Sequence, residues 1–100
     1  MTHLESRKYE LMYIVKPDED PERISSLVSR FRDLIEELGG TVENLDEWGD
    51  RRLAYEIDDY FDGYYVVVEY LADETLNQEL DRRIGLDEAI MRSMITRVEE

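Results

Sequence analysis

The sequence predicts a single α+β domain, a four-stranded antiparallel sheet with two helices packed on one of its faces. Two segments place apolar residues at the 3.6-residue period of a helix, and four segments are rich in β-branched and aromatic residues. Their order along the chain is β-α-β-β-α-β. One hundred residues, 42% of them hydrophobic, are enough for one domain with one core.

The first predicted strand covers residues 8–15, which read Lys-Tyr-Glu-Leu-Met-Tyr-Ile-Val. Its two faces carry, respectively, Tyr9, Leu11, Tyr13 and Val15, and Glu10, Met12 and Ile14. Because both faces are largely apolar, we expect a central strand that is covered on both sides. Residues 1–7 are expected to form a flexible N-terminus.

The first helix is predicted to begin at Pro21, with Asp20 as its N-cap. Apolar residues then share one helical face for about four turns. They are Ile24, Leu27, Val28, Phe31, Leu34, Ile35 and Leu38. Gly39 and Gly40 are expected to end the helix, because glycine tolerates the left-handed backbone conformation of a helix cap.

The next two strands are predicted at residues 41–57 and 64–71, joined by an acidic loop at residues 58–63. The first of these strands is long, and we expect a bend near Gly49. The second reads Tyr-Tyr-Val-Val-Val-Glu-Tyr-Leu and has the strongest β-propensity in the chain.

The second helix is predicted between its N-cap Asp73 and Gly85. Its apolar residues Leu76, Leu80 and Ile84 are spaced four apart. Residues 89–98 form the last predicted strand. The complete order is that of the split βαβ, or ferredoxin-like, fold.

The charge of the chain restricts its partners. Its 26 acidic and 12 basic residues give a net charge of −14, and ten of the basic residues are arginines. We expect a chain this acidic to repel nucleic acid. The acid excess and scarce lysine also suggest a halophilic source. The chain has no cysteine and no apolar run near the ~20 residues that span a bilayer, so a soluble cytoplasmic protein is expected.

A pair of adjacent arginines marks the most informative segment. The run Gly49-Asp50-Arg51-Arg52-Leu53-Ala54-Tyr55-Glu56-Ile57 resembles the signature of the bacterial small-subunit ribosomal protein S6 family. Three further blocks agree with the family in order and spacing. They are Tyr9-Glu10 with Ile14-Val15 and Pro17, then Gly63-Tyr64, then Arg92-Ser93-Met94-Ile95-Thr96-Arg97. The resemblance therefore covers nearly the whole chain.

The resemblance implies a structural, non-enzymatic protein of the small ribosomal subunit that needs no cofactor, metal or small-molecule substrate. Family members pair with small-subunit ribosomal protein number eighteen (S18) and bind the central domain of the small-subunit ribosomal RNA. By position, the resemblance implies RNA-binding roles for six basic residues, Arg7, Lys8, Arg51, Arg52, Arg92 and Arg97. Arginine suits this role because its planar guanidinium binds phosphate through two hydrogen bonds.

Surface ion pairs are the competing interpretation of every arginine in so acidic a chain. This interpretation is favoured for the arginines that fall beside acids on the predicted helices, namely Arg30, Arg32, Arg82 and Arg83. The acids Asp58, Asp59 and Asp62 also weaken the case for RNA contact at the loop between the two middle strands.

The third predicted strand offers a surface for the partner. Tyr64, Val66, Val68 and Tyr70 share one face of this strand, and Tyr65, Val67 and Leu71 share the other. Two helices cover only one face of the sheet, so the other face leaves tyrosines and valines exposed, as at contact sites. We assign the face of Tyr64, Val66, Val68 and Tyr70 to partner binding.

Other functions fit the sequence less well. A ligand-sensing or regulatory ferredoxin-like homodimer, joined through its open sheet face, remains the alternative. An RNA-recognition motif has the same element order, but the run from Asp62 lacks its basic, small and second aromatic residues. An enzyme would need a placed base, and the only histidine is His3. Asp58, Asp62, Gly63 and Glu69 have calcium-loop spacing, but position three is Tyr60 and a strand follows.

Overall fold

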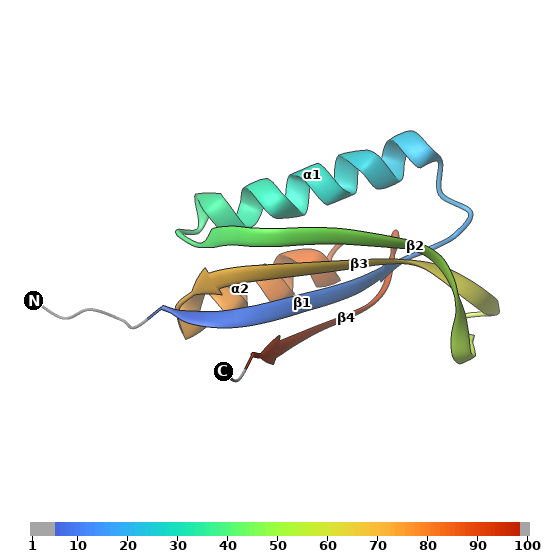
Figure 1. The fold of residues 1–100 in the computed structure, drawn as a ribbon. Helices are drawn as coiled ribbons and strands as arrows, with labels where there is room; N and C mark the ends of the chain where they lie inside the picture. Colours follow the sequence, from blue (N-terminus) through green and yellow to red (C-terminus); the bar gives the residue numbers. More distant parts are fainter. Residues whose placement is uncertain (1–5, 99–100) are drawn as a thin grey trace, which may run out of the picture.

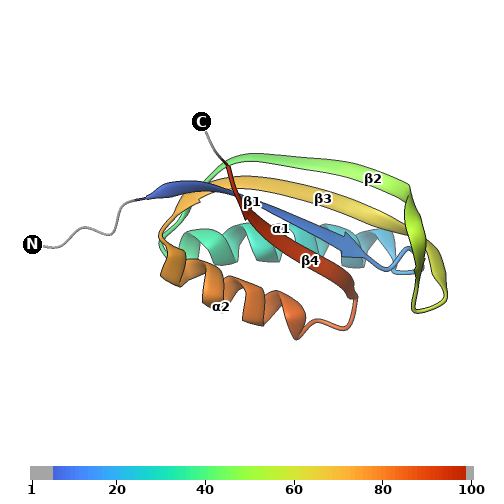
Figure 2. The same ribbon diagram turned by 90° about the horizontal axis from the view of Figure 1, so that it is seen from below.

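The computed structural model describes residues 6–98 and confirms the predicted fold. Along the chain the elements are β1 (Arg7–Val15), α1 (Pro21–Glu37), β2 (Thr41–Ile57), β3 (Tyr60–Ala72), α2 (Glu74–Gly85) and β4 (Ile90–Arg97). The strands form one antiparallel sheet in the order β2-β3-β1-β4. Both helices lie on the same side of this sheet (Figures 1 and 2). Within residues 6–98, no helix is long and apolar enough to cross a membrane.

The N-terminal boundary of β1 lies earlier than the sequence predicts. Arg7, expected in a flexible segment, is already in the strand and pairs with Ala72 of β3. Its neighbours in the first five positions lie outside the described residues. At the other end of β1, the backbone N–H of Lys16 donates to the carbonyl of Ala89 at 2.8 Å. This bond fixes the strand against the segment that leads into β4.

The first helix begins and ends at the predicted residues. Asp20 is the N-cap with an extended backbone and Pro21 is the first helical residue, but the Asp20 side chain makes no capping hydrogen bond. After Glu37 the chain turns at Gly39, which has a φ of 101°. Glycine adopts this positive φ without strain because it has no Cβ atom. The predicted apolar face is buried through Ile24, Leu27, Val28, Phe31, Leu34 and Ile35. This face holds α1 against the sheet.

The second helix has a stronger N-terminal cap. The carboxylate of Asp73 accepts a hydrogen bond from the backbone N–H of Leu76 at 2.9 Å. The hydroxyl of Tyr70, at the end of β3, donates to Oδ1 of Asn77 at 2.6 Å. Leu76, Leu80 and Ile84 are buried, as their spacing predicts. The helix is therefore fixed by its cap, by one partly buried hydrogen bond and by its apolar face.

A long hairpin of β2 and β3 replaces the predicted loop at residues 58–63. Only Asp58 and Asp59 form the turn, and β3 already begins at Tyr60. Both turn residues have positive φ, 49° and 69°, which suits a two-residue hairpin turn and which aspartate tolerates. The predicted bend is present at Gly49, where φ is 81° and the register shifts. The hairpin extends beyond the rest of the sheet and bends at its distal end (Figures 1 and 2).

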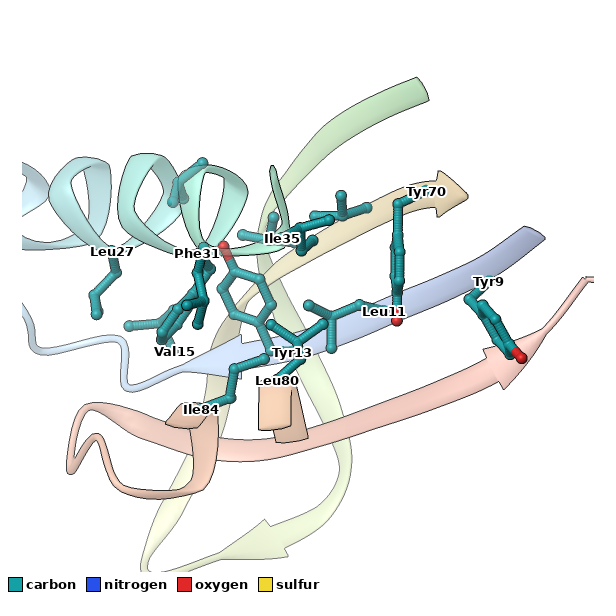
Figure 3. Close-up of a cluster of buried hydrophobic side chains, with 14 of the residues drawn as sticks. Tyr9, Leu11, Tyr13, Val15, Leu27, Phe31, Ile35, Tyr70, Leu80 and Ile84 are labelled. Carbon is teal, nitrogen blue, oxygen red and sulfur yellow. The ribbon is translucent and has the colours of Figure 1, made fainter. Parts of the chain in front are cut away.

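The core lies between the helices and one face of the sheet. Strand β1 contributes Tyr9, Leu11, Tyr13 and Val15, the residues predicted to share a face. The ring of Tyr13 packs edge-on against Phe31, with centroids 5.3 Å apart and planes at 87°. Its hydroxyl is buried and has no hydrogen-bond partner among residues 6–98. Figure 3 shows these side chains between α1, α2 and the two central strands.

The register of β3 on β1 overturns one prediction. Val66 lies opposite Tyr13, Val68 opposite Leu11 and Tyr70 opposite Tyr9. The side chains of Val66, Val68 and Tyr70 therefore point to the helices, as those of their β1 partners do. Each of the three β3 residues is 0% exposed. Assigning Val66, Val68 and Tyr70 to partner binding was therefore wrong, because the two helices cover that face.

Candidate partner and nucleic-acid interface

The sheet face without helices is here called the open face. It carries those side chains of the central strands β1 and β3 that alternate with the core residues. From β1 it presents Lys8, Glu10, Met12 and Ile14, and opposite these lie Leu71, Glu69, Val67 and Tyr65 of β3. Strand β4 adds Thr96, Met94 and Arg92. The face of β3 that the helices leave uncovered is therefore that of Tyr65, Val67 and Leu71, where Tyr65 and Leu71 are partly exposed and Val67 is only 7% exposed.

Tyr64, the fourth residue assigned to partner binding, stands apart from the buried three. It is half-buried at the edge of the core, and its hydroxyl donates to Glu47 at 2.9 Å. Burial and the hydrogen bond to this carboxylate raise the pKa of Tyr64. Its ring belongs to the helix side of the sheet, so it does not extend the open face.

Under the bent hairpin the open face is hollowed into a groove of about 320 Å³, here called the hairpin groove. Its floor is Met12, Ile14 and Tyr65, and the hairpin contributes Leu53, Ala54, Tyr55 and Ile57. Arg92, Ser93 and Met94 of β4 form the remaining side. Apolar atoms dominate this lining, and its hydrogen-bonding side chains are Tyr55, Tyr65, Arg92 and Ser93.

A contact between Arg92 and Tyr55 joins the two sides of the hairpin groove. The guanidinium of Arg92 donates to the hydroxyl of Tyr55 at 2.6 Å, and its carbon lies 5.5 Å from the centre of the ring. These positions are 37 residues apart in the sequence. The contact holds the distal hairpin over β4 and uses one of the predicted RNA-binding arginines.

Gly63 allows the base of the hairpin to lie close to β1. It is buried, and a Cβ atom at this position would overlap the Cγ2 of Ile14. Nearby, the hydroxyl of Tyr60 donates to Asp18 in the segment after β1 at 2.8 Å. These contacts position the arm that carries the paired-arginine motif.

The opposite end of the open face is acidic. Glu10, Glu43 and Glu69 lie there with Lys8, whose ammonium is 3.4 Å from Glu69 and 3.8 Å from Glu43. Asp46 continues this charge along β2 to the row of Val67 and Met12, beside the hairpin groove. Glu10 and Glu69 are direct cross-strand neighbours. Like charges in such a pair repel one another, so this region favours a cationic partner. We call these four carboxylates the acidic strip.

The structure separates the six predicted RNA-binding residues into two groups. Arg7, Lys8 and Arg97 lie where β1 begins and β4 ends, as shown by the 2.9 Å bond from the Val98 N–H to the Lys8 carbonyl. Arg51, Arg52 and Arg92 lie toward the hairpin. Arg97 lies opposite Tyr9 and Arg92 opposite Ile14, so the nearest members of the two groups are about 17 Å apart along the strands.

Arg51 and Arg52 differ from the arginines of the helices. Both are exposed on β2, and their side chains make no ion pair or hydrogen bond within the described part of the chain. The predicted ion pairs of the helical arginines are confirmed: Arg30 with Asp87, Arg32 with Asp33, and Arg82 and Arg83 with Glu79. The hydrogen bond from Arg82 lowers the pKa of Glu79.

Comparison with known proteins decides the family. Residues 8–97 match the family model described as Ribosomal protein S6. The chain belongs to the ribosomal protein S6 family. This agrees with the resemblance of the paired-arginine motif, and it makes the chain a structural ribosomal protein rather than an enzyme.

Relatives in the S6 family match along almost their whole length. The small ribosomal subunit protein bS6 of Alkaliphilus metalliredigens is 46% identical over 93% of this chain and 98% of the relative. That of Desulforamulus reducens is 43% identical over 91% and 96%. The crystal structure of 30S ribosomal protein S6 from Thermotoga maritima superposes with a TM-score of 0.90, at 32% identity, over 94% of this chain and 89% of that one. The S6 family therefore accounts for the whole described fold.

Proposed function

We propose that this chain is a structural protein of the small ribosomal subunit that pairs with S18 and, with it, binds the central domain of the small-subunit ribosomal RNA. Membership of the S6 family supports the ribosomal role. The open face supports the pairing, because it leaves apolar side chains of β1, β3 and β4 without helix cover. The basic residues near the hairpin support the RNA contact.

One observation carries the RNA contact, namely that Arg51 and Arg52 are exposed and lack partners within residues 6–98. The chain has 26 acids and 12 bases. In residues 6–98, ion pairs to carboxylates engage Lys8, Arg23, Arg30, Arg32, Arg82 and Arg83, but not Arg51 or Arg52. Consecutive strand residues point to opposite faces, so the two guanidiniums offer two separate phosphate contacts, neither of them occupied by a partner within residues 6–98. Contacts of this kind position a protein on RNA without reading its sequence.

The charge of the chain explains why the partner is required. A net charge of −14 opposes approach to a polyanion, and two arginines offset little of it. A basic protein on the acidic open face would cancel part of this charge and add phosphate contacts of its own. Most of the counterion release that drives RNA binding would then come from the partner.

The experiment compares two charge reversals of equal size. The variant Arg51→Glu with Arg52→Glu changes the hairpin arginines, and Arg82→Glu with Arg83→Glu changes the paired arginines of α2 as the control. Each variant is mixed with S18 and ribosomal RNA, and its incorporation into the resulting protein–RNA complex is measured by sedimentation. We expect the hairpin variant to incorporate poorly, with a salt dependence of RNA binding weaker by about one to two phosphate contacts. Equal incorporation of the two variants would contradict the RNA-binding role of Arg51 and Arg52.

A further inference from the structure

The hairpin groove has the size and lining of an anchor site for a side chain. Its volume of about 320 Å³ is at the small end of the ~300–1,000 Å³ range of small-molecule pockets. Such pockets combine apolar walls with convergent polar groups that fix a ligand. Here two of the four hydrogen-bonding side chains of the lining, Arg92 and Tyr55, already bind each other. An uncharged aliphatic or aromatic side chain fits this lining better than a polar metabolite does.

The walls of the groove are set before any partner arrives. Ile14 and Leu53, which line it, are only 4% and 8% exposed and are held by the packing of the hairpin base. The contact between Arg92 and Tyr55 fixes the distal wall. By contrast, Met94 is 50% exposed in the lining, and the unbranched methionine side chain adapts to the shape of a contacting group. A rigid pocket with an adaptable methionine border is suited to anchoring.

The acidic strip favours a basic side chain in the partner segment that carries the anchoring side chain. Glu10 lies four residues before Ile14 on β1, a distance of about 13 Å along the strand. Glu69 lies directly opposite Glu10, Glu43 and Asp46 lie on the neighbouring β2 side of the open face, and Lys8 pairs with Glu43 and Glu69. A lysine or arginine there gains Coulomb energy from carboxylates that repel one another. A second copy of this chain is disfavoured, because its own acidic strip would face this one.

We infer that the open face recognises an extended basic segment of its partner, which places one aliphatic or aromatic side chain in the hairpin groove and a lysine or arginine about 13 Å away on the acidic strip. This inference rests on the proposed pairing with S18 and adds the chemistry of the contact. The groove contributes affinity, and the acidic strip contributes orientation and the rate of association.

The groove is tested by a charge placed in its border. Met94→Asp introduces a carboxylate beside the anchor, and Leu86→Asp, an exposed apolar residue after α2, is the matched control. Binding of the full chain to S18 is measured by titration calorimetry, with melting temperature as the check on folding. We expect Met94→Asp to weaken binding about 30-fold or more, as for an interface anchor, and Leu86→Asp to leave it unchanged. Ala54→Trp, which fills the groove from the hairpin, is expected to give the same loss.

The acidic strip is tested separately. Glu10→Lys reverses one of its charges, and Glu36→Lys makes the same change on the exposed side of α1. We expect Glu10→Lys to slow association with S18 and to reduce its salt dependence, with little effect from Glu36→Lys.

The binding measurements distinguish failure of the anchor site from failure of the pairing with S18. If the unchanged protein binds S18 and Met94→Asp and Ala54→Trp bind it equally well, the anchor site is refuted while the pairing stands. If the unchanged protein does not bind S18 at all, the proposed pairing fails and the inference fails with it. Self-association that Met94→Asp abolishes would assign the groove to a second copy and overturn the inference.

Discussion

Replacing Tyr13 with phenylalanine is expected to stabilise the protein. The substitution removes one hydroxyl from a side chain that is 0% exposed, and that hydroxyl has no hydrogen-bond partner among residues 6–98. A buried polar group without a partner costs about 1–3 kcal/mol. The ring stays in place against Phe31, so no cavity forms. We therefore expect a gain of about 1–2 kcal/mol, or a melting temperature higher by about 4–8 °C per kcal/mol.

Tyr70 provides a matched comparison. It is also 0% exposed, but its hydroxyl donates to Asn77 at 2.6 Å. Tyr70→Phe removes the donor and leaves the amide oxygen of a half-buried asparagine without its partner. We expect a loss of about 0.5–1.5 kcal/mol, opposite in sign to the effect at Tyr13.

The two tyrosines also determine the response to alkali. Burial is the main cause that raises the pKa of Tyr13 and of Tyr70 far above the ordinary value of 10.0. Below pH 10 both states keep these protons and stability is unaffected. Above pH 10 the unfolded chain releases protons that the folded chain retains, so stability falls by up to about 1.4 kcal/mol per pH unit for each tyrosine. Tyr13→Phe is expected to make this decline shallower.

Urea denaturation at pH 7 and at several values above pH 10 measures both effects. An unchanged slope of free energy against urea would show that neither variant alters the folded or unfolded ensemble. If Tyr13→Phe is as destabilising as Tyr70→Phe, the Tyr13 hydroxyl has a partner in solution and the reasoning is refuted. A decline above pH 10 that is identical in both variants and the parent would refute the linkage to these groups.

Three further outcomes are expected. Phe31→Ala removes a fully buried ring and is expected to cost about 3–5 kcal/mol in chemical denaturation; a loss under ~1 kcal/mol would exclude Phe31 from the core. Asp73→Ala is expected to cost about 1 kcal/mol because the carboxylate caps Leu76, while Asp20→Ala, which lacks such a bond, costs less; equal losses would contradict the capping geometry. Raising NaCl from about 0.05 M to about 1 M is expected to raise the melting temperature by screening the net charge of −14, and an unchanged value would argue against a salt-adapted surface.

The element order was predictable because hydrophobic period and end signals agreed at each boundary. Pro21 and Gly39 bound α1, and Asp73 and Gly85 bound α2, close to the predicted positions. The error at the β2–β3 connection came from composition. Six residues rich in aspartate are typical of a loop, but the two that form the turn adopt positive φ and the others extend the strands.

The exposed face of β3 was misassigned because periodicity separates two faces without saying which one the helices cover. One face of β3 carries Tyr64 and Val66 and the other carries Tyr65 and Val67, so the two faces are nearly equally apolar. The missed signal was Glu69, which shares a face with Tyr65, Val67 and Leu71 and lies opposite Glu10 of β1. Two carboxylates across one strand pair avoid the core, so the face that carries them is the outer one.

The candidate site was predictable in its motif but not in its geometry. The sequence singles out Arg51 and Arg52, and it predicts ion pairs for the helical arginines that the structure confirms. The hairpin groove depends on a bend at Gly49 and on a contact between Tyr55 and Arg92 across 37 positions. Such long-range contacts follow from twist and register, which local patterns do not specify.

The position of Trp48 makes the open face directly observable. It is the only tryptophan in the sequence, it is 44% exposed, and its ring stacks on Tyr65 at 6.2 Å with planes 12° apart. Its indole N–H donates to Asp46, a member of the acidic strip, at 3.0 Å. Water leaves this indole when another protein covers the face, so its emission shifts to shorter wavelength. The chain thus carries an intrinsic fluorophore at the surface in question, and docking is measurable in real time without a label.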